Sequence, residues 1–339
     1  MKQKVNVGLI GAGRIGTLHA AHLTHRIPQA NLVAVSDTYR PAAQACAARF
    51  EIATVETDHQ AILARDDVEA VVICSSTDTH AQIIIDAAEA GKHIFCEKPI
   101  HFDLAEIDRA LAAVEETGVK LQIGFNRRFD PTFREVHDRV LEGRIGKPHI
   151  LRITSRDPQP PPIDYVKVSG GMFLDMTIHD FDMARYLIGS EVEEIFALGQ
   201  VLVDPAIGEA GDIDTAILTL RFANGAIGTI DNSRQAVYGY DQRVEVFGSA
   251  GVISTANQTP HRATYSDRKG VHAALPLHFF IERYVDSYIA EMEAFVRCVL
   301  QDTPPSVSGQ DGRIPVVMGY AAQKSLREGR PVRLEEIAT

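Results

Sequence analysis

The start of the chain constrains its fold more than any other stretch. A short apolar run, Val5–Ile10, enters a glycine-rich turn and continues into a segment rich in alanine and leucine. This order predicts a strand, a tight turn and a helix, with Gly11, Gly13 and Gly16 in the spacing G-x-G-x-x-G. Gly11 permits the turn, Gly13 lets a pyrophosphate approach the backbone, and Gly16 lets the helix lie close to the strand. The sequence therefore predicts a dinucleotide-binding turn.

A second predicted strand, residues 31–36, ends at Asp37. A carboxylate about 20 residues beyond such a glycine motif typically accepts hydrogen bonds from the adenosine ribose. Because Asp37 would repel a ribose 2′-phosphate, it favours NAD, although Arg40, three residues later, softens that exclusion. We expect NAD as the cofactor and NADP as a slow substitute at most.

Composition limits the partners of the protein. A chain of 339 residues suggests about two domains, and 45% hydrophobic with 23% charged residues is ordinary for a globular protein. The net charge of −11 argues against nucleic acid and acidic membranes as partners. The four cysteines, Cys46, Cys74, Cys96 and Cys298, lack metal-ligand spacing, and no apolar run reaches bilayer length. We expect a reduced, cytoplasmic protein.

Strand and helix patterns alternate through the first part of the chain. Further strands are predicted at residues 68–74, 93–96 and 120–124, and helices at 40–50, 59–64, 81–90 and 103–117, with a polar turn at 75–80. Such alternation predicts an α/β fold, with a doubly wound parallel sheet, in residues 1–124. The carboxyl ends of its strands form the ligand crevice. Five polar or glycine positions fall there: Gly11, Asp37, Ser75, Lys98 and Asn126.

The alternation stops after residue 128. Strands are predicted at 149–155, 192–203, 214–222, 225–233, 243–248 and 251–256, and helices at 131–141, 172–187, 280–300 and 312–328. This pattern predicts an α+β domain in residues 125–339 with an open, mostly antiparallel sheet. A C-terminal segment is free to return to the first domain, and residues 331–335 could be a strand of either one. Because a wide free sheet face is often covered by another subunit, we expect a homo-oligomer.

Two stretches carry residues suited to catalysis. Lys98, between Glu97 and a proline, ends a predicted strand, where its ammonium group could stabilise a developing alkoxide. Asp175 and His179 are four residues apart on the predicted helix 172–187, so both could face one bound hydroxyl, with His179 as base. A metal site of Asp175, His179 and Asp182 is the less favoured interpretation, because no distant residue supplies a further ligand.

Other polar residues are weaker candidates. Asp157 precedes a proline-rich loop that could line a sugar-sized pocket. Tyr238 and Tyr240 lie in a predicted turn, where exposed aromatic rings are a mild indication of binding.

Together these motifs resemble the glucose–fructose oxidoreductase/inositol dehydrogenase/MocA family of NAD(P)-dependent oxidoreductases. The similarity spans essentially the whole chain. It is carried by the glycine motif, residues 95–100 (FCEKPI), residues 124–130 (GFNRRFD), and Gly170-Gly171 followed by residues 175–182 (DMTIHDFD). Within the family, the sequence is most similar to inositol 2-dehydrogenases.

The resemblance implies a catalytic triad of Lys98, Asp175 and His179, no metal, and a homotetramer built through the open sheet. In that triad, His179 takes the proton of the reacting hydroxyl, Lys98 binds its oxygen, and Asp175 orients the histidine. The expected cofactor contacts are Gly11, Gly13, Arg14, Ile15, Gly16, Asp37, Ser75, Thr77, His80, Glu97, Lys98 and Arg127. The expected substrate contacts are Lys98, Asn126, Asp157, Asp175, His179, Tyr238 and Tyr240.

The activity implied is NAD-dependent oxidation of myo-inositol to 2-keto-myo-inositol. A scyllo-inositol or aldose dehydrogenase would use the same three residues. A non-catalytic NAD-binding sensor is the alternative of another class, and the intact set of Lys98, Asp175 and His179 weighs against it.

Overall fold

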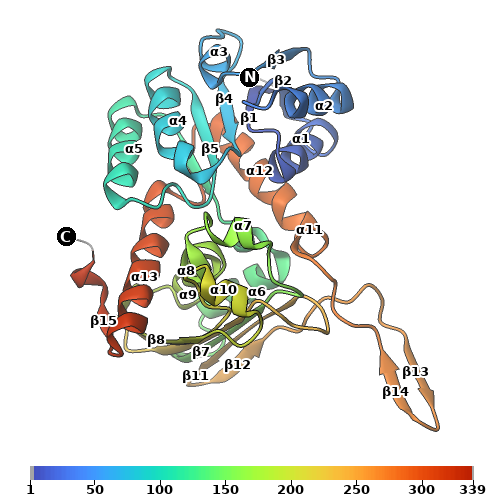
Figure 1. Ribbon diagram of the computed structural model, residues 1–339, viewed down its shortest axis with the longest axis vertical. Helices are drawn as coiled ribbons and strands as arrows, with labels where there is room; N and C mark the ends of the chain where they lie inside the picture. The colour runs from blue at the N-terminus through green and yellow to red at the C-terminus, as the bar shows by residue number, and fades with distance from the viewer. Residues whose placement is uncertain (1–3, 338–339) are drawn as a thin grey trace. The chain divides into compact units, whose positions relative to one another are not determined.

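The computed structural model describes residues 4–337, which form two compact units. The first unit contains the described residues up to Phe129 and the segment Asp286–Ile314. The second contains Asp130–Val285 and the described residues from Pro315 onward. The contacts thus keep residues 125–129 with the first unit, whereas the sequence pattern placed the domain boundary after Gly124. Figure 1 shows the returning helix α12 (Val285–Gln301) among the elements of the first unit.

The first unit is built on a six-stranded parallel sheet in the order β3-β2-β1-β4-β5-β6. Its strands are β1 (Val5–Ile10), β2 (Ala30–Ser36), β3 (Thr54–Glu56), β4 (Ala70–Ile73), β5 (His93–Glu97) and β6 (Leu121–Gly124). This order confirms the predicted doubly wound sheet. The sequence pattern missed β3 at the edge, because three residues are too few to show a period.

The helices of the first unit are α1 (Arg14–His25), α2 (Arg40–Phe50), α3 (His59–Leu63), α4 (Thr77–Glu89), α5 (Leu104–Thr117) and the 3₁₀ turn η1 (Asn126–Phe129). Side chains of α1, α2 and α12 pack into one buried cluster with β1, β4 and β5. Helix α4 begins at Thr77 rather than Ala81, so most of the predicted polar turn is helical. Asp78 in the first turn favours this earlier start by complementing the helix dipole.

The second unit contains a seven-stranded mixed sheet in the order β12-β11-β7-β10-β9-β8-β15. Its strands are β7 (Pro148–Arg156), β8 (Val192–Gln200), β9 (Thr215–Phe222), β10 (Ile227–Ser233), β11 (Asp241–Gly248), β12 (Gly251–Ser254) and β15 (Val332–Arg333). All neighbours pair antiparallel except β7 and β10, which run parallel. This confirms the predicted mostly antiparallel sheet, and the pairing of β15 with β8 assigns the C-terminal strand to it.

The other helices are α6 (Pro131–Leu141), α7 (Ile163–Val166), α8 (Gly171–Asp175), α9 (Thr177–Ile188), α10 (Pro205–Glu209), α11 (Phe280–Arg283), α13 (Gly309–Glu328) and the 3₁₀ turn η2 (Leu334–Glu336). Two predicted helices are interrupted. Helix 172–187 is divided at Met176, and helix 280–300 at Tyr284. The Tyr284 ring packs edge-on against Tyr240, a long-range contact that local periodicity does not encode.

A two-stranded hairpin was also missed by the sequence pattern. Within the part of the chain that the structure describes, strands β13 (Thr264–Asp267) and β14 (Gly270–Ala273) pair only with each other, and all their residues are exposed. Figure 1 shows this hairpin extending from the second unit. None of the helices within residues 4–337 is long and apolar enough to cross a membrane.

The seven-stranded sheet leaves apolar side chains on its outer face. Along β9, for example, buried and outward residues alternate, and Ile217 on the outer face is 56% exposed. Ile227, Ile150, Phe247 and Val252 are register partners across β10, β7, β11 and β12. Three of these side chains, those of Ile227, Phe247 and Val252, are among the exposed large hydrophobic ones. We call these four residues the apolar row.

Candidate functional site

The glycine turn in the first unit leaves one side open. Gly11 has φ +95°, and a Cβ there would meet the backbone of Cys74 and Ser75. A Cβ on Gly16 would overlap the carbonyl oxygen of Gly11, so this glycine lets α1 lie against the turn. Around Gly13, by contrast, a Cβ would meet no atom within 4 Å. The open side at Gly13 and the start of α1 fit the pyrophosphate of a dinucleotide.

Asp37 is tied to this turn. Its Oδ2 accepts a hydrogen bond of 2.7 Å from the N–H of Ala12, and its Oδ1 accepts one of 2.8 Å from the N–H of Tyr39. The carboxylate is therefore held between the glycine turn and the start of α2, and its side chain is half-buried. Arg40, the first residue of α2, is exposed. At the start of α1, Arg14 is exposed and Ile15 is half-buried.

The loop after β4 is held mainly by its own polar groups. The hydroxyls of Ser75 and Thr79 are 2.7 Å apart, and Thr77 begins α4. His80, a predicted cofactor contact, is only 2% exposed. Its Nδ1 lies 2.9 Å from the carbonyl oxygen of Pro99 and its Nε2 lies 3.1 Å from that of Ser75. Burial lowers the pKa of His80, and its ring braces two loops instead of facing open space.

Glu97 and Lys98 lie at the carboxyl end of β5. Glu97 Oε1 is 2.7 Å from His19 Nε2, and Lys98 is half-buried. Two further predicted contacts, Asn126 and Arg127, lie in η1 and are 2% and 5% exposed. The Asn126 amide donates a long hydrogen bond of 3.4 Å to the Ser287 hydroxyl, so it also fastens the returning segment to this unit.

In the second unit, Arg234 brings two predicted site residues together. Because β7 and β10 are parallel with Arg156 opposite Ser233, the next residues, Asp157 and Arg234, also lie side by side. The guanidinium group of Arg234 is buried. It donates a hydrogen bond of 2.9 Å to Asp175 Oδ2 and one of 3.5 Å to Asp157 Oδ2. Although burial alone would lower it, the pKa of Arg234 is raised by Asp175 and Asp157.

Asp175 has a further partner that the sequence did not suggest. The Tyr165 hydroxyl donates a hydrogen bond of 2.8 Å to Asp175 Oδ1. Burial, followed by the negative charge of Asp175, raises the pKa of Tyr165, so this phenol stays a donor at neutral pH. Both oxygens of Asp175 are thus held by hydrogen bonds, which fixes the orientation of its side chain.

The segment that carries Asp175 and His179 is positioned by polar contacts. Asp212 Oδ1 accepts the N–H of Met172 at 3.1 Å, at the start of α8. The Asn232 side chain, on β10, accepts a hydrogen bond of 2.7 Å from the Thr177 hydroxyl and donates one of 2.8 Å to Asp180 Oδ2. These contacts fix α9 against the sheet and place His179, which is half-buried, in its first turn.

The expected i, i+4 pair is therefore not carried by one continuous helix. Asp175 ends α8, and His179 is the third residue of α9, with Met176 between the two helices. The capping of α8 by a residue of another loop, Asp212, is a tertiary contact that the helical period does not reveal.

The two predicted tyrosines differ. The Tyr238 hydroxyl accepts a hydrogen bond of 3.1 Å from Arg156 and donates one of 2.7 Å to Asp241, so it belongs to a polar network. Tyr240, expected as an exposed ring, is 6% exposed and packs edge-on against Tyr284. The expectation of exposure was wrong for Tyr240, because the chain folds over it and its N–H bonds to the carbonyl oxygen of Leu277.

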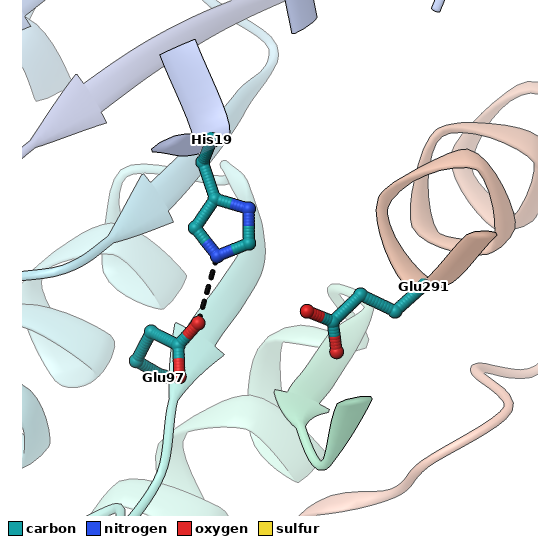
Figure 2. A group of neighbouring side chains, drawn as sticks. All are labelled: His19, Glu97 and Glu291. Atoms are coloured by element: carbon teal, nitrogen blue, oxygen red, sulfur yellow. Dashed lines mark hydrogen bonds and ion pairs between the residues drawn. The ribbon is translucent and has the colours of Figure 1, made fainter. Parts of the chain in front are cut away.

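One group of three potential metal ligands was found among the described residues. It consists of His19, Glu97 and Glu291 in the first unit (Figure 2), and not of Asp175, His179 and Asp182. Glu291 lies on the returning helix α12, and neither it nor Arg234 was singled out from the sequence. A glutamate and an arginine are ordinarily solvent-exposed, so their patterns alone gave no signal.

Comparisons with known proteins cover both units. Residues 5–125 match the family model described as an oxidoreductase family with an NAD-binding Rossmann fold, and residues 133–254 match the GFO/IDH/MocA C-terminal domain. The chain is 51% identical over 333 residues to a myo-inositol 2-dehydrogenase of Thermotoga maritima, covering 98% of this chain and 99% of the relative. It is 46% identical to an inositol 2-dehydrogenase of Rhizobium meliloti, with 97% and 99% coverage.

A solved structure extends the comparison to ligands. The chain resembles a myo-inositol dehydrogenase from Lactobacillus casei in complex with NAD(H) and myo-inositol, with a TM-score of 0.88 and 27% identity. The match covers 97% of this chain and 96% of that structure.

Proposed function

The chain belongs to the GFO/IDH/MocA family of NAD-binding oxidoreductases, and from that premise we propose that it oxidises myo-inositol to 2-keto-myo-inositol. The observation that carries this proposal is the joining of Asp157 and Asp175 by the buried Arg234, in the unit that also holds His179. Several fixed polar groups in one unit suit a substrate with a hydroxyl on every ring carbon. The inositol dehydrogenases similar to this chain over nearly its whole length support the same substrate.

In the proposed reaction, three side chains act on the reacting hydroxyl. His179 takes its proton, because an imidazole is the side chain best matched to proton transfer near neutral pH. Lys98 donates a hydrogen bond to the same oxygen and stabilises the negative charge that develops on it. Asp175, fixed by Tyr165 and Arg234, stabilises the imidazolium form of His179. NAD, when bound, supplies the acceptor for the hydride.

We assign cofactor binding to the first unit and substrate binding to the second. The turn at Gly13 and the carboxylate of Asp37 support NAD in preference to NADP, since Asp37 would repel a 2′-phosphate. The other predicted cofactor contacts stay predictions: Gly11, Arg14, Ile15, Gly16, Ser75, Thr77, His80, Glu97, Lys98 and Arg127.

We further propose a cytoplasmic homotetramer assembled through the outer face of the seven-stranded sheet. The apolar row and the exposed hairpin support assembly, because exposed apolar patches mark interaction surfaces and a lone two-stranded hairpin is marginally stable in water. Four cysteines without a disulfide among the described residues are compatible with a reducing compartment.

The first experiment is NADH formation with myo-inositol, scyllo-inositol and glucose, for the wild type and His179→Ala. We expect the highest kcat/KM with myo-inositol and a loss of about a thousandfold in the variant, within the range for general-base catalysis. Faster turnover of scyllo-inositol or glucose would retain the family and replace the substrate. Absence of turnover with any polyol or sugar, with NAD or NADP, would favour the sensor alternative.

A further inference from the structure

A buried carboxyl group lies beside Glu97 and belongs to the segment that returns to the first unit late in the chain. Figure 2 shows Glu291 of α12 facing the hydrogen-bonded pair of His19 and Glu97. One ligand atom from each of the three residues lies within 4.8 Å of the other two. Glu291 is 0% exposed, and neither of its carboxyl oxygens has a hydrogen-bond partner among residues 4–337.

The surroundings of Glu291 oppose a negative charge. The rings of Phe95 and Tyr288 pack edge-on against His19, which is itself 0% exposed. Burial, followed by the negative charge of Glu97, raises the pKa of Glu291 well above its ordinary value. A second carboxylate here would have no compensating partner, which is a costly arrangement in a protein interior.

Other contacts hold α12 at this place. The Gln122 side chain on β6 donates a hydrogen bond of 2.8 Å to the backbone carbonyl oxygen of Glu291. One helical turn later, the ring of Phe295 packs against that of Phe95. The Glu97 carboxyl group also lies close to β6, since a Cβ on Gly124 would come within 3.1 Å of it. Glu97 therefore has close neighbours on both β6 and α12.

We propose that Glu291 is a positioning residue for cofactor binding: as a neutral carboxylic acid it packs beside the His19–Glu97 pair and holds the Glu97 carboxylate in one orientation. This inference rests on the proposed function, in which Glu97 contacts the cofactor. With Glu291 uncharged, Glu97 keeps its hydrogen bond to His19 and accepts another from a hydroxyl of a bound ribose. A second charge would push the Glu97 carboxylate away from this geometry.

A divalent cation is the competing occupant of the cluster. A cation bound through His19 Nε2 would have to replace the hydrogen bond of 2.7 Å between that atom and Glu97 Oε1. A proton on Glu291 removes the second negative charge without breaking that bond. The geometry therefore favours a protonated acid over a metal site.

The test compares Glu291→Gln with Glu293→Gln, a matched change at an exposed position of the same helix. If Glu291 keeps its proton only in the folded protein, rising pH favours the unfolded state of the wild type. Above the ordinary pKa of a glutamate, 4.5, the unfolding constant of the wild type then rises by up to about tenfold per pH unit relative to that of Glu291→Gln. The rise ends at the pH at which Glu291 ionises in the folded protein. Thermal and urea unfolding of the apoprotein measure this. Glu293→Gln should follow the wild type at every pH.

The second readout is the dissociation constant of NADH, measured by fluorescence titration across the same pH range and above it. The titratable side chains around Glu291 are His19, Glu97, Cys74 and Tyr288, and all four are unchanged in Glu291→Gln. We expect NADH affinity of the wild type to fall at alkaline pH, as Glu291 ionises, and that of Glu291→Gln to lack this fall.

Three results would overturn the proposal. These are a pH-independent stability difference between wild type and Glu291→Gln, identical pH profiles of NADH affinity, or a stoichiometric divalent metal that is lost in the variant. If the variant does not fold, infrared spectra of the wild type at neutral pH still decide whether a protonated carboxyl band is present. None of these readouts uses a substrate, so failure of the inositol proposal would leave them interpretable.

Discussion

At the scale of single residues, Arg234 is the side chain on which the substrate unit most depends. Replacing it by methionine leaves the half-buried carboxyl groups of Asp157 and Asp175 near each other without their shared cation. Removing one partner of a buried pair typically costs about 3–5 kcal/mol of stability. We expect Arg234→Met to lower the melting temperature and to reduce kcat/KM for myo-inositol by about a hundredfold or more, because Asp175 loses the hydrogen bond that fixes its orientation.

Two further variants separate this effect from general damage. Arg234→Lys keeps the charge but lacks the planar fork that contacts both carboxylates, so it should recover stability better than activity. Arg109→Met removes an exposed helical pair with Glu106 on α5, worth about 1 kcal/mol or less, and should behave like the wild type. Full activity of Arg234→Met would show that the reaction does not depend on Arg234.

At the scale of elements, the sequence predicted what local chemistry determines. The strand, turn and helix around Gly11 follow from glycine spacing and β-branched residues, and the structure has them. The start of α9 after Met176 and the return of α12 involve distant partners, namely Asn232, which binds Thr177, and the buried cluster of the first unit. The loop after Asp157 indicated that residue from the sequence. The position of Arg234 beside Asp157 depends on the parallel pairing of β7 and β10, which local sequence does not predict.

The glycine turn offers an element-scale test, because two alanine substitutions should fail differently. Gly16→Ala forces α1 away from the turn, since its Cβ would overlap the Gly11 carbonyl oxygen, and we expect a lower melting temperature in the apoprotein. Gly13→Ala meets no protein atom, so its melting temperature should stay near that of the wild type. Its methyl group would occupy the space for the pyrophosphate, and we expect NADH affinity to fall by about tenfold or more.

Differential scanning fluorimetry of the apoproteins and NADH titration measure the two effects. Wild-type NADH affinity in Gly13→Ala would show that the cofactor does not approach the backbone there. An unchanged melting temperature in Gly16→Ala would show that the helix can shift without cost.

At the scale of the whole molecule, the apolar row predicts how copies of the chain associate. Its side chains are register partners across four strands, so a partner subunit would bury them as one continuous strip. A carboxylate introduced at Phe247, 45% exposed in the single chain, would be desolvated without a partner in that interface.

We therefore expect Phe247→Asp to dissociate the oligomer, as measured by analytical ultracentrifugation, while the melting temperature of the isolated chain changes little. Leu141→Asp is the matched control, because Leu141 is also an exposed apolar residue, at the end of α6 and outside the sheet. It should leave the oligomer intact. If Phe247→Asp sediments like the wild type, the subunits associate through another surface, and the exposed hairpin of β13 and β14 becomes the next segment to alter. If the wild type is itself a monomer, the tetramer proposal fails, and the apolar row needs another explanation.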